Sequence, residues 1–326
     1  EPVIGEVTPI ANAQTKENKR PEITAKLTNV GENPVLTMTV NGEAVEIVYT
    51  AVETGTWPGY TVKYGDGTTA TYAVDGGTIT NTQEPTELSV IKAWKNADES
   101  TTPPDGAEVT FTLFADGTDT GYSVTLDGTA DAAITGAGGY ESEAWKATFV
   151  NLPKYKIVNG RAVEIQYTVT ETGTWPGYVV TYGSGMSDFV PTYAVDGQTI
   201  TNTEESTYIT VIKAWENADG TTTAPEGATV TFTLYADGSR TEYTAVLDGT
   251  ADTTVPEGTA GFEPEAWTAA FIRLPKYKIV NDAAVEIEYT VVETGTWAGY
   301  IVIYEGEDAV SAIANGVITN KEVPTG

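Results

Sequence analysis

The segment AVEIQYTVTETGTWPGY, residues 162–178, decides how this chain is interpreted, because it occurs three times. Near-identical copies begin at Ala44 (AVEIVYTAVETGTWPGY) and at Ala284 (AVEIEYTVVETGTWAGY). The copies start about 120 residues apart, which is the size of a domain, whereas solenoids and propellers repeat at roughly 20–50 residues. The chain is therefore predicted to be a row of related domains, called modules below.

Short alternating runs rich in Val, Ile, Thr and Tyr fill each module, and Asp-Gly, Asn-Gly and Pro-Gly turns separate them. This pattern is typical of an all-β antiparallel sandwich of about seven strands, and no helical periodicity of useful length is present. The expected domains are an N-terminal segment with a partial module in residues 1–82, a full module in 83–205, and a full module with a short tail in 206–326.

The first module is expected to be incomplete, because residues 22–82 match only the second half of the other two. Three explanations stay open. The missing strands lie upstream in a longer chain, or another subunit supplies them by strand complementation. Alternatively, Val3 to Ile10 folds back as the first strand, with Gly5 near the position that a lysine occupies in the other modules.

The composition restricts the classes of function. The 326 residues include 46 acidic and 17 basic side chains, a formal charge of −29, which argues against nucleic acid and anionic membrane surfaces as partners. No apolar run approaches the roughly 18–20 residues of a membrane span. The chain has no Cys and no His, which excludes disulfides, thiolate metal sites and Ser-His-Asp catalysis. No cofactor, no metal and no enzymatic turnover are expected.

A carboxylate falls on the face of the repeated segment that the alternation assigns to the core. Residues two apart in a strand share a face. The apolar face from Val163 to Val169 continues to Glu171, so this side chain is predicted to be buried. The other two copies place Glu53 and Glu293 in the same phase.

A lysine and an asparagine repeat with the same conflict. Lys92 shares a face with Trp94 in the first strand of the second module, and Lys213 shares one with Trp215 in the third. In the last strand an asparagine shares a face with an isoleucine, although asparagine is disfavoured within strands; the three positions are Asn81, Asn202 and Asn320. The nearby LPKYK lysines, at 154, 156, 276 and 278, are predicted to lie in a solvated loop.

A buried lysine, glutamate and asparagine together form a reactive set. Burial lowers the pKa of a lysine and raises that of a glutamate, which favours a neutral amine and a neutral acid. If the first and last strands are neighbours, the amine can attack the asparagine carbonyl. The acid would polarise that carbonyl and carry the proton to the departing ammonia. The predicted product is a Lys–Asn isopeptide crosslink, made once per module.

The segments VIKAW, YTVTE and TITNT, in that order around ADG and NLPKY, resemble the Cna protein B-type domain of Gram-positive surface adhesins and pilins. The resemblance covers residues 88–203 and 207–321, and the second half of a module in 22–82. It implies an immunoglobulin-like reverse sandwich. It also implies roles for three residue types: the isopeptide lysines are Lys92 and Lys213, the catalytic acids Glu171 and Glu293, and the isopeptide asparagines Asn202 and Asn320.

The first module carries only part of this set, Glu53 and Asn81. No VxKxW segment precedes them, and Lys26 aligns with Thr148 of the second module, which makes it a poor substitute. A crosslink in this module is therefore not expected from the sequence.

The function expected from the resemblance is a stalk or fibre segment of a cell-surface protein, pilus or extracellular filament, stiffened by the crosslinks. The expected partners are further copies in a fibre, and the expected location is the Gram-positive cell surface. The alternative is an adhesin or carbohydrate-binding repeat, with a host matrix or glycan ligand stacked on the TGTWxGY turns at Trp57, Trp175 and Trp297. The ending KEVPTG, residues 321–326, resembles the tail of sortase substrates but lacks the full five-residue motif.

One further motif, DGTAD, pairs Asp127 with Asp131 and Asp248 with Asp252. Its acidic residues lack the dense oxygen-ligand spacing of a calcium loop. Asp-Gly turns explain the motif better, so an ordinary turn is predicted here.

Overall fold

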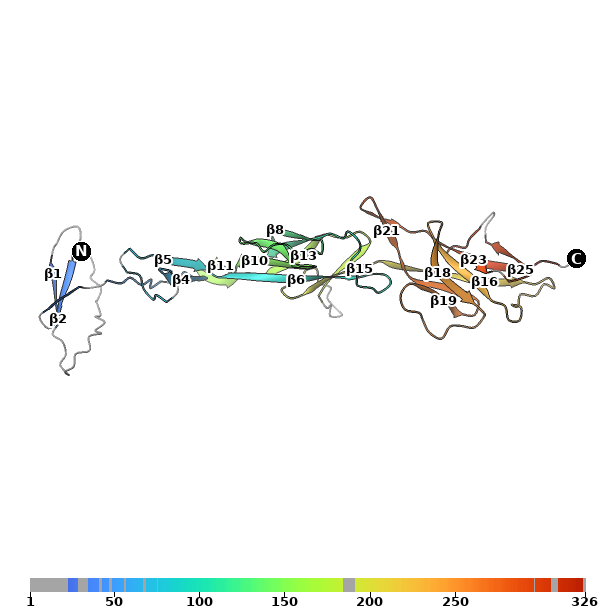
Figure 1. Ribbon diagram of the computed structural model, residues 1–326, viewed down its shortest axis with the longest axis horizontal. Coiled ribbons are helices and arrows are strands. Elements are labelled where there is room, and N and C mark those ends of the chain that lie inside the picture. The colour runs from blue at the N-terminus through green and yellow to red at the C-terminus, as the bar shows by residue number, and fades with distance from the viewer. Residues whose placement is uncertain are drawn as a thin grey trace. The chain divides into compact units, whose positions relative to one another are not determined.

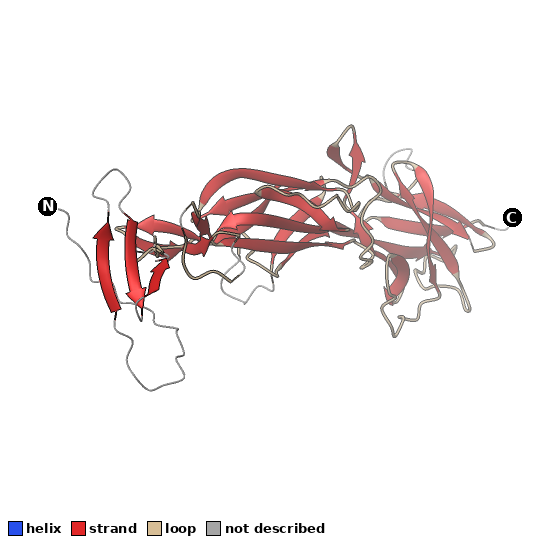
Figure 2. Cartoon of the chain, turned by 60° about the vertical axis from the view of Figure 1, so that its left-hand side comes forward, coloured by secondary structure: helices blue, strands red, loops and turns tan. Residues whose placement is uncertain are grey.

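The computed structural model describes residues 23–28, 35–40, 43–46, 49–55, 57–66, 69–74, 76–183, 191–295, 297–305 and 310–324. The chain divides into two compact units, Glu1–Gln83 and Glu84–Gly326. Throughout the described residues the regular elements are strands, as Figure 2 shows. None of the described segments is a helix long and apolar enough to cross a membrane. The predicted all-β class is confirmed.

The second unit begins with a module of ten strands, several of which are labelled in Figure 1. Five form one sheet in the order β14-β15-β6-β10-β9, three form a second sheet in the order β13-β7-β8, and β11 pairs with β12 as a separate hairpin. The strands are β6 Pro85–Lys95, β7 Val109–Ala115, β8 Thr118–Leu126, β9 Gly138–Glu143, β10 Lys146–Pro153, β11 Tyr155–Val158, β12 Arg161–Glu164, β13 Tyr167–Gly173, β14 Tyr178–Tyr182 and β15 Thr199–Glu204.

The same architecture follows once more in this unit. The sheets have the orders β19-β20-β16-β25-β24 and β18-β17-β23, and the hairpin is β21-β22. The strands are β16 Ser206–Glu216, β17 Val230–Ala236, β18 Ser239–Leu247, β19 Ala260–Glu265, β20 Thr268–Pro275, β21 Tyr277–Val280, β22 Ala283–Glu286, β23 Tyr289–Gly295, β24 Tyr300–Tyr304 and β25 Val317–Glu322. In its described residues each of these two full modules thus has eight sandwich strands and a hairpin, whereas about seven strands were expected from the sequence.

Each module has its own hydrophobic core between its two sheets. Alternate residues of the facing strands point inward and bury large side chains completely, because the two sheets exclude water from the faces that they share. The largest buried side chains are Phe111, Leu113, Leu126, Phe149, Leu152 and Ile200 in the second module, and Phe232, Leu234, Leu247, Phe271, Leu274 and Ile318 in the third.

The first and last strands of a module are neighbours, and they run parallel although the other strand pairs within each sandwich are antiparallel. In the second module β15 pairs with β6 so that Ile200 lies opposite Lys92 and Asn202 opposite Trp94. The third module repeats this register. Because residues two apart share a face, Lys92 and Asn202 lie diagonally on the same side of the sheet.

Two expectations need correction, one about the repeated segment and one about the LPKYK segment that precedes it. The expected continuous strand is interrupted after Glu164, where the hairpin strand β12 ends before β13 begins at Tyr167. Val163 is consequently 42% exposed instead of buried. The LPKYK segment is not simply a loop, because Lys156 lies in β11 and pairs with Asp116 at 2.8 Å. Tertiary pairing of the hairpin overrides the local alternation here.

The first unit differs from the modules that follow. The strands β1 Ile23–Thr28, β2 Val35–Val40 and β3 Glu43–Glu46 form an antiparallel sheet, and β4 Tyr60–Tyr64 pairs with β5 Ile79–Gln83. An isolated bridge joins Ala51 to Ala73, as equivalent bridges do at Val169–Ala194 and Val291–Ala312. The proposed strand at Val3 to Ile10 and the side chain of Lys26 lie outside the described residues.

Candidate functional site

Lys92 points into the core of the second module. Leu88, Val90, Lys92 and Trp94 alternate along β6 and all are buried, with Lys92 only 3% exposed. The Nζ atom donates a hydrogen bond to the Ala93 carbonyl oxygen at 2.8 Å. It also lies 4.2 Å from the centroid of the Trp94 ring, close enough for a cation–π contact.

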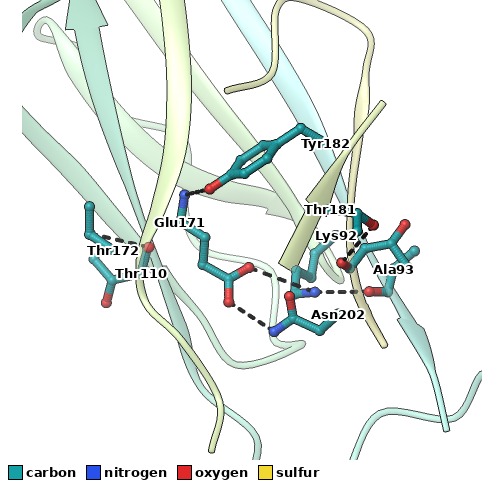
Figure 3. A network of polar contacts seen from close by, with 9 residues as sticks. Lys92, Ala93, Thr110, Glu171, Thr172, Thr181, Tyr182 and Asn202 are labelled. Atoms are coloured by element: carbon teal, nitrogen blue, oxygen red, sulfur yellow. Dashed lines mark hydrogen bonds and ion pairs between the residues drawn. The ribbon is translucent and has the colours of Figure 1, made fainter. Parts of the chain in front are cut away.

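The carboxylate that faces this lysine comes from the opposite sheet. Glu171 lies on β13, is 8% exposed, and places Oε2 3.8 Å from Lys92 Nζ. Its Oε1 accepts a hydrogen bond of 2.8 Å from Nδ2 of Asn202, which is fully buried on β15 (Figure 3). The two sheets therefore bring together a lysine, a glutamate and an asparagine, as the alternation predicted for their burial.

The third module builds the same site from its own strands. Lys213 Nζ lies 3.6 Å from Glu293 Oε2, and Asn320 Nδ2 donates to Glu293 Oε1 at 2.9 Å. Lys213 also donates to two carbonyl oxygens, those of Ala214 at 2.8 Å and Ile318 at 3.2 Å. The side chains of Lys213 and Glu293 are fully inaccessible to solvent, as are those of Lys92 and Glu171.

Burial shifts both titrating groups toward their neutral forms. Desolvation lowers the pKa of Lys92 from 10.5 to about 8, although the charge of Glu171 partly opposes this. Burial raises the pKa of Glu171, against the hydrogen bond from Asn202 and the charge of Lys92. The pKa of Lys213 is likewise lowered to about 8 by burial, and that of Glu293 is raised. A neutral amine is a nucleophile, and a neutral carboxyl can donate a proton.

The orientation of the amide indicates how the acid would act. The amide nitrogen Nδ2 of Asn202 faces the Glu171 carboxyl, and among the described residues Oδ1 has no hydrogen-bond partner. A protonated Glu171 is thus positioned to deliver a proton to the nitrogen that would depart as ammonia. The sequence led us to expect that the same acid would polarise the carbonyl. For that, the side-chain amide of Asn202 would have to rotate so that Oδ1, and not Nδ2, faces Glu171.

Four aromatic side chains lie in the site or next to it. The Tyr182 hydroxyl accepts a hydrogen bond from the Glu171 backbone N–H at 3.1 Å (Figure 3). Trp94 packs edge-on against Trp145 and Tyr178, with ring centroids 5.3 and 5.5 Å apart. Trp94 covers the lysine, and burial is the main cause of the lowered pKa of Lys92.

A second buried acid in each module was missed from the sequence. Glu141 is 1% exposed, and its carboxylate accepts three backbone hydrogen bonds, from Asp127 at 2.9 Å, Gly128 at 3.1 Å and Trp145 at 2.6 Å. Asp131 in turn accepts the Glu141 N–H. Glu263 repeats this arrangement in the third module. The DGTAD turn is therefore organised around a glutamate from β9, whose only sequence signal is its repetition in ESEAW and EPEAW.

The pH dependence of bond formation follows from the shifted groups. A bond formed at this site would need the form of the lysine–glutamate pair that holds one proton, with that proton on the acid and the amine neutral. Raising the pH through the lysine pKa of about 8 removes this proton, and lowering it through the raised glutamate pKa adds a second one to the pair. We therefore expect a bell-shaped rate that falls above about pH 8.

This profile can be measured on chain recovered unfolded from inclusion bodies and refolded at different pH values. Intact mass reports bond formation over time, and tryptophan fluorescence reports folding separately. A bond-formation rate that keeps rising well above the lysine pKa would contradict the one-proton mechanism.

The first unit holds only part of the constellation. Asn81 Nδ2 donates to both oxygens of Glu53, at 3.3 Å to Oε1 and 3.1 Å to Oε2. The Tyr64 hydroxyl accepts the Glu53 backbone N–H at 3.0 Å, as Tyr182 does for Glu171. Unlike its counterparts, Asn81 is exposed.

The tryptophan turns differ in their surroundings. Trp175 and Trp297 are partly buried and pack against the cores of their modules. Trp57, in the first unit, is 60% exposed. Packing over a strand end accounts for the first two, which leaves Trp57 as the more open ring.

Comparisons with known proteins point to one family. The model of the Cna protein B-type domain matches residues 88–203 and 209–321. Among solved structures, the chain is similar to one B repeat unit of the collagen-binding surface protein Cna of Staphylococcus aureus, at 26% identity and a TM-score of 0.26, over 74% of this chain and all of that one.

Two further solved structures are similar at lower identity. The Bacillus anthracis TIE protein matches at 15% identity and a TM-score of 0.39, over 94% of this chain and 59% of that one. The shaft pilin SpaA of Lactobacillus rhamnosus GG matches at 15% and 0.24, over 74% of this chain and 99% of that one. The comparison with curated proteins finds no match.

Proposed function

The chain belongs to the Cna protein B-type domain family, and from this membership we propose that it is a structural segment of a bacterial surface protein or pilus, stiffened by internal isopeptide bonds. The bonds join Lys92 to Asn202 and Lys213 to Asn320. Glu171 and Glu293 act as the acids that assist each reaction. The proposed location is outside the cell, at the surface of a Gram-positive bacterium.

The observation that carries this proposal is the buried constellation, which occurs twice with the same geometry. In both the second and the third module a lysine lies 3.6–3.8 Å from a carboxylate that also binds the asparagine amide. An uncompensated charge is costly inside a core, and replacing a buried ion pair with apolar residues of similar size is often neutral or stabilising. A reaction that removes the charges explains why these polar groups are kept there.

The position of the proposed bond suits a load-bearing role. The first and last strands of the module, β6 and β15, run parallel, so a pull on the two ends of the module would slide one along the other. A covalent bond from Lys92 to Asn202 would join these strands directly. Tension would then pass through the bond instead of unfolding the chain between them.

Intact mass tests the proposal. The purified chain is expected to weigh two ammonia molecules less than its sequence, because each bond releases one. Lys92→Ala is expected to abolish one of the two losses and leave the other. Lys95→Ala is a matched control, because Lys95 lies on the exposed face of the same strand. A mass equal to that of the plain sequence would exclude both bonds.

The domain organisation is proposed with the same boundaries as in the sequence analysis: a partial module in residues 1–82, and full modules in 83–205 and 206–326. We further propose that another polypeptide completes the partial module by strand complementation, which would link segments into a fibre. Electron microscopy of concentrated chain distinguishes the cases. Filaments would support complementation between copies, whereas isolated particles at every concentration would oppose it.

A binding role stays the alternative. It rests on the exposed ring of Trp57, since Trp175 and Trp297 pack against their own cores. Glycan or matrix-protein binding that is lost in Trp57→Ala would favour it.

A further inference from the structure

The first unit retains a module's acid and asparagine, and the asparagine lies on a strand with one edge that no described strand covers. In the second module, β15 lies between β14 and β6, and in the third, β25 lies between β24 and β16. The corresponding strand of the first unit, β5, pairs with β4, and no other described strand lies on its opposite edge. That edge is where the lysine-bearing strand runs in the other two modules.

The exposed fractions of two β5 side chains agree with an edge that no described strand covers. Ile79 on β5 is 36% exposed, whereas its counterparts Ile200 and Ile318 are completely buried. Asn81 is exposed, whereas Asn202 and Asn320 are completely buried. An apolar side chain and a reactive amide on one open strand edge are therefore both available to an incoming strand.

The Glu53 carboxylate has the orientation expected for a site that contains the asparagine but no lysine. In the second module Glu171 gives one oxygen to the asparagine and turns the other toward Lys92. In the first unit both oxygens of Glu53 accept hydrogen bonds from Asn81. A lysine ammonium that approached this edge would meet a carboxylate, which gives the site charge complementarity for a basic side chain.

We propose that Glu53 and Asn81 form a covalent acceptor site for a lysine-bearing β-strand of another polypeptide. The strand pairs parallel to β5 and has the alternation of residues 88–95, with an apolar residue two positions before the lysine and an aromatic residue two positions after it. In the register of the intact modules, its lysine lies opposite Ile79 and its aromatic residue opposite Asn81. This inference rests on the proposed isopeptide chemistry and adds a partner to it.

The covalent step balances without any further reagent. The incoming lysine amine attacks Cγ of Asn81, so that an Nζ–Cγ bond forms and the Cγ–Nδ2 bond breaks. Glu53 takes the proton released by the lysine nitrogen and gives it to Nδ2, which leaves as ammonia. The carboxylate is regenerated, and one amide has replaced another.

The test incubates the full chain with synthetic peptide of residues 86–96, and in parallel with a longer polypeptide of residues 85–143, which spans β6 to β9. The longer probe adds β7, β8 and β9 to β6, in case one strand alone binds too weakly. The expected product is the sum of the two masses less one ammonia, with the new bond mapped to Asn81 by digestion. Loss of the adduct is expected with Asn81→Ala, with Glu53→Gln, and with arginine in place of Lys92 in the probe, whereas arginine in place of Lys95 should leave the adduct.

The outcomes separate this inference from the proposed function. The same spectra count the internal bonds of the chain. Internal bonds without an adduct from either probe, or an adduct that persists in Asn81→Ala, would overturn the acceptor site alone. Absence of internal bonds would overturn the proposed function.

A sample without probe tells where the strand comes from. Covalent oligomers that disappear in Asn81→Ala indicate that a further copy of this chain supplies the lysine. A monomer that reacts only with added probe indicates a different polypeptide as the donor.

Discussion

Replacing Asn202 with Ala is expected to lower the melting temperature of the second module by about 15–30 °C. The proposed bond closes a loop on the order of 100 residues, and a crosslink over such a loop stabilises a domain by about 4–5 kcal/mol through the entropy of the unfolded chain. The variant keeps Lys92 and Glu171 as a buried pair, so the loss reports mainly on the bond. Differential scanning calorimetry measures it.

The third module provides the control within the same molecule. The proposed bond between Lys213 and Asn320 is unaffected by the substitution, so the transition of the third module is expected to stay at the same temperature. Asn320→Ala should reverse the pattern. Two transitions that stay unchanged in both variants, with masses that show bonds in the parent chain, would contradict a stabilising role for the crosslinks.

Replacing Glu141 with Ala is expected to destabilise the second module by about 3–6 kcal/mol, the lower part of the range for three unsatisfied donors, because these donors are only partly buried. Three backbone N–H groups, those of Asp127, Gly128 and Trp145, lose a buried acceptor. Each unsatisfied buried donor costs about 1–3 kcal/mol. Trp145 also packs on Trp94 beside the reactive lysine, so a disordered turn should slow bond formation as well.

Chemical denaturation measures this loss, and a neighbouring glutamate provides the matched control. The Glu143 side chain is 73% exposed, and its only ion pair among the described residues is with Lys146 at the surface. Glu143→Ala should therefore change the free energy of unfolding little. Similar losses in the two variants would mean that the Glu141 carboxylate does not hold the turn. Glu263→Ala and Glu265→Ala repeat the comparison in the third module.

The buried positions of the reactive set follow from alternation. Lys92 and Glu171 were predicted to be buried because each continues an apolar face along its strand, and both are. The interruption after Glu164 and the exposure of Val163 were not predictable in this way. They result from a hairpin pairing between β11 and β12, which local periodicity cannot reveal.

Glu141 shows why a functional side chain can escape sequence analysis. Its carboxylate binds the backbone of a turn about fourteen residues earlier and of Trp145 four residues later. Backbone donors are present at every residue, so no residue type marks them. The turn itself was predicted, but the side chain that holds it was not.

The amino-acid sequence by itself determined the modular repeat, the all-β class and the phase that turns lysine, glutamate and asparagine inward. These properties depend on periodicity along one strand, which is local. Only the tertiary structure decided that β6 and β15 are parallel neighbours and that Glu171 reaches them from the facing sheet. The same holds for the edge of β5 that no described strand covers. A strand's neighbours depend on how distant segments pair, and alternation within one strand sets the face that is buried but not which strand pairs with it.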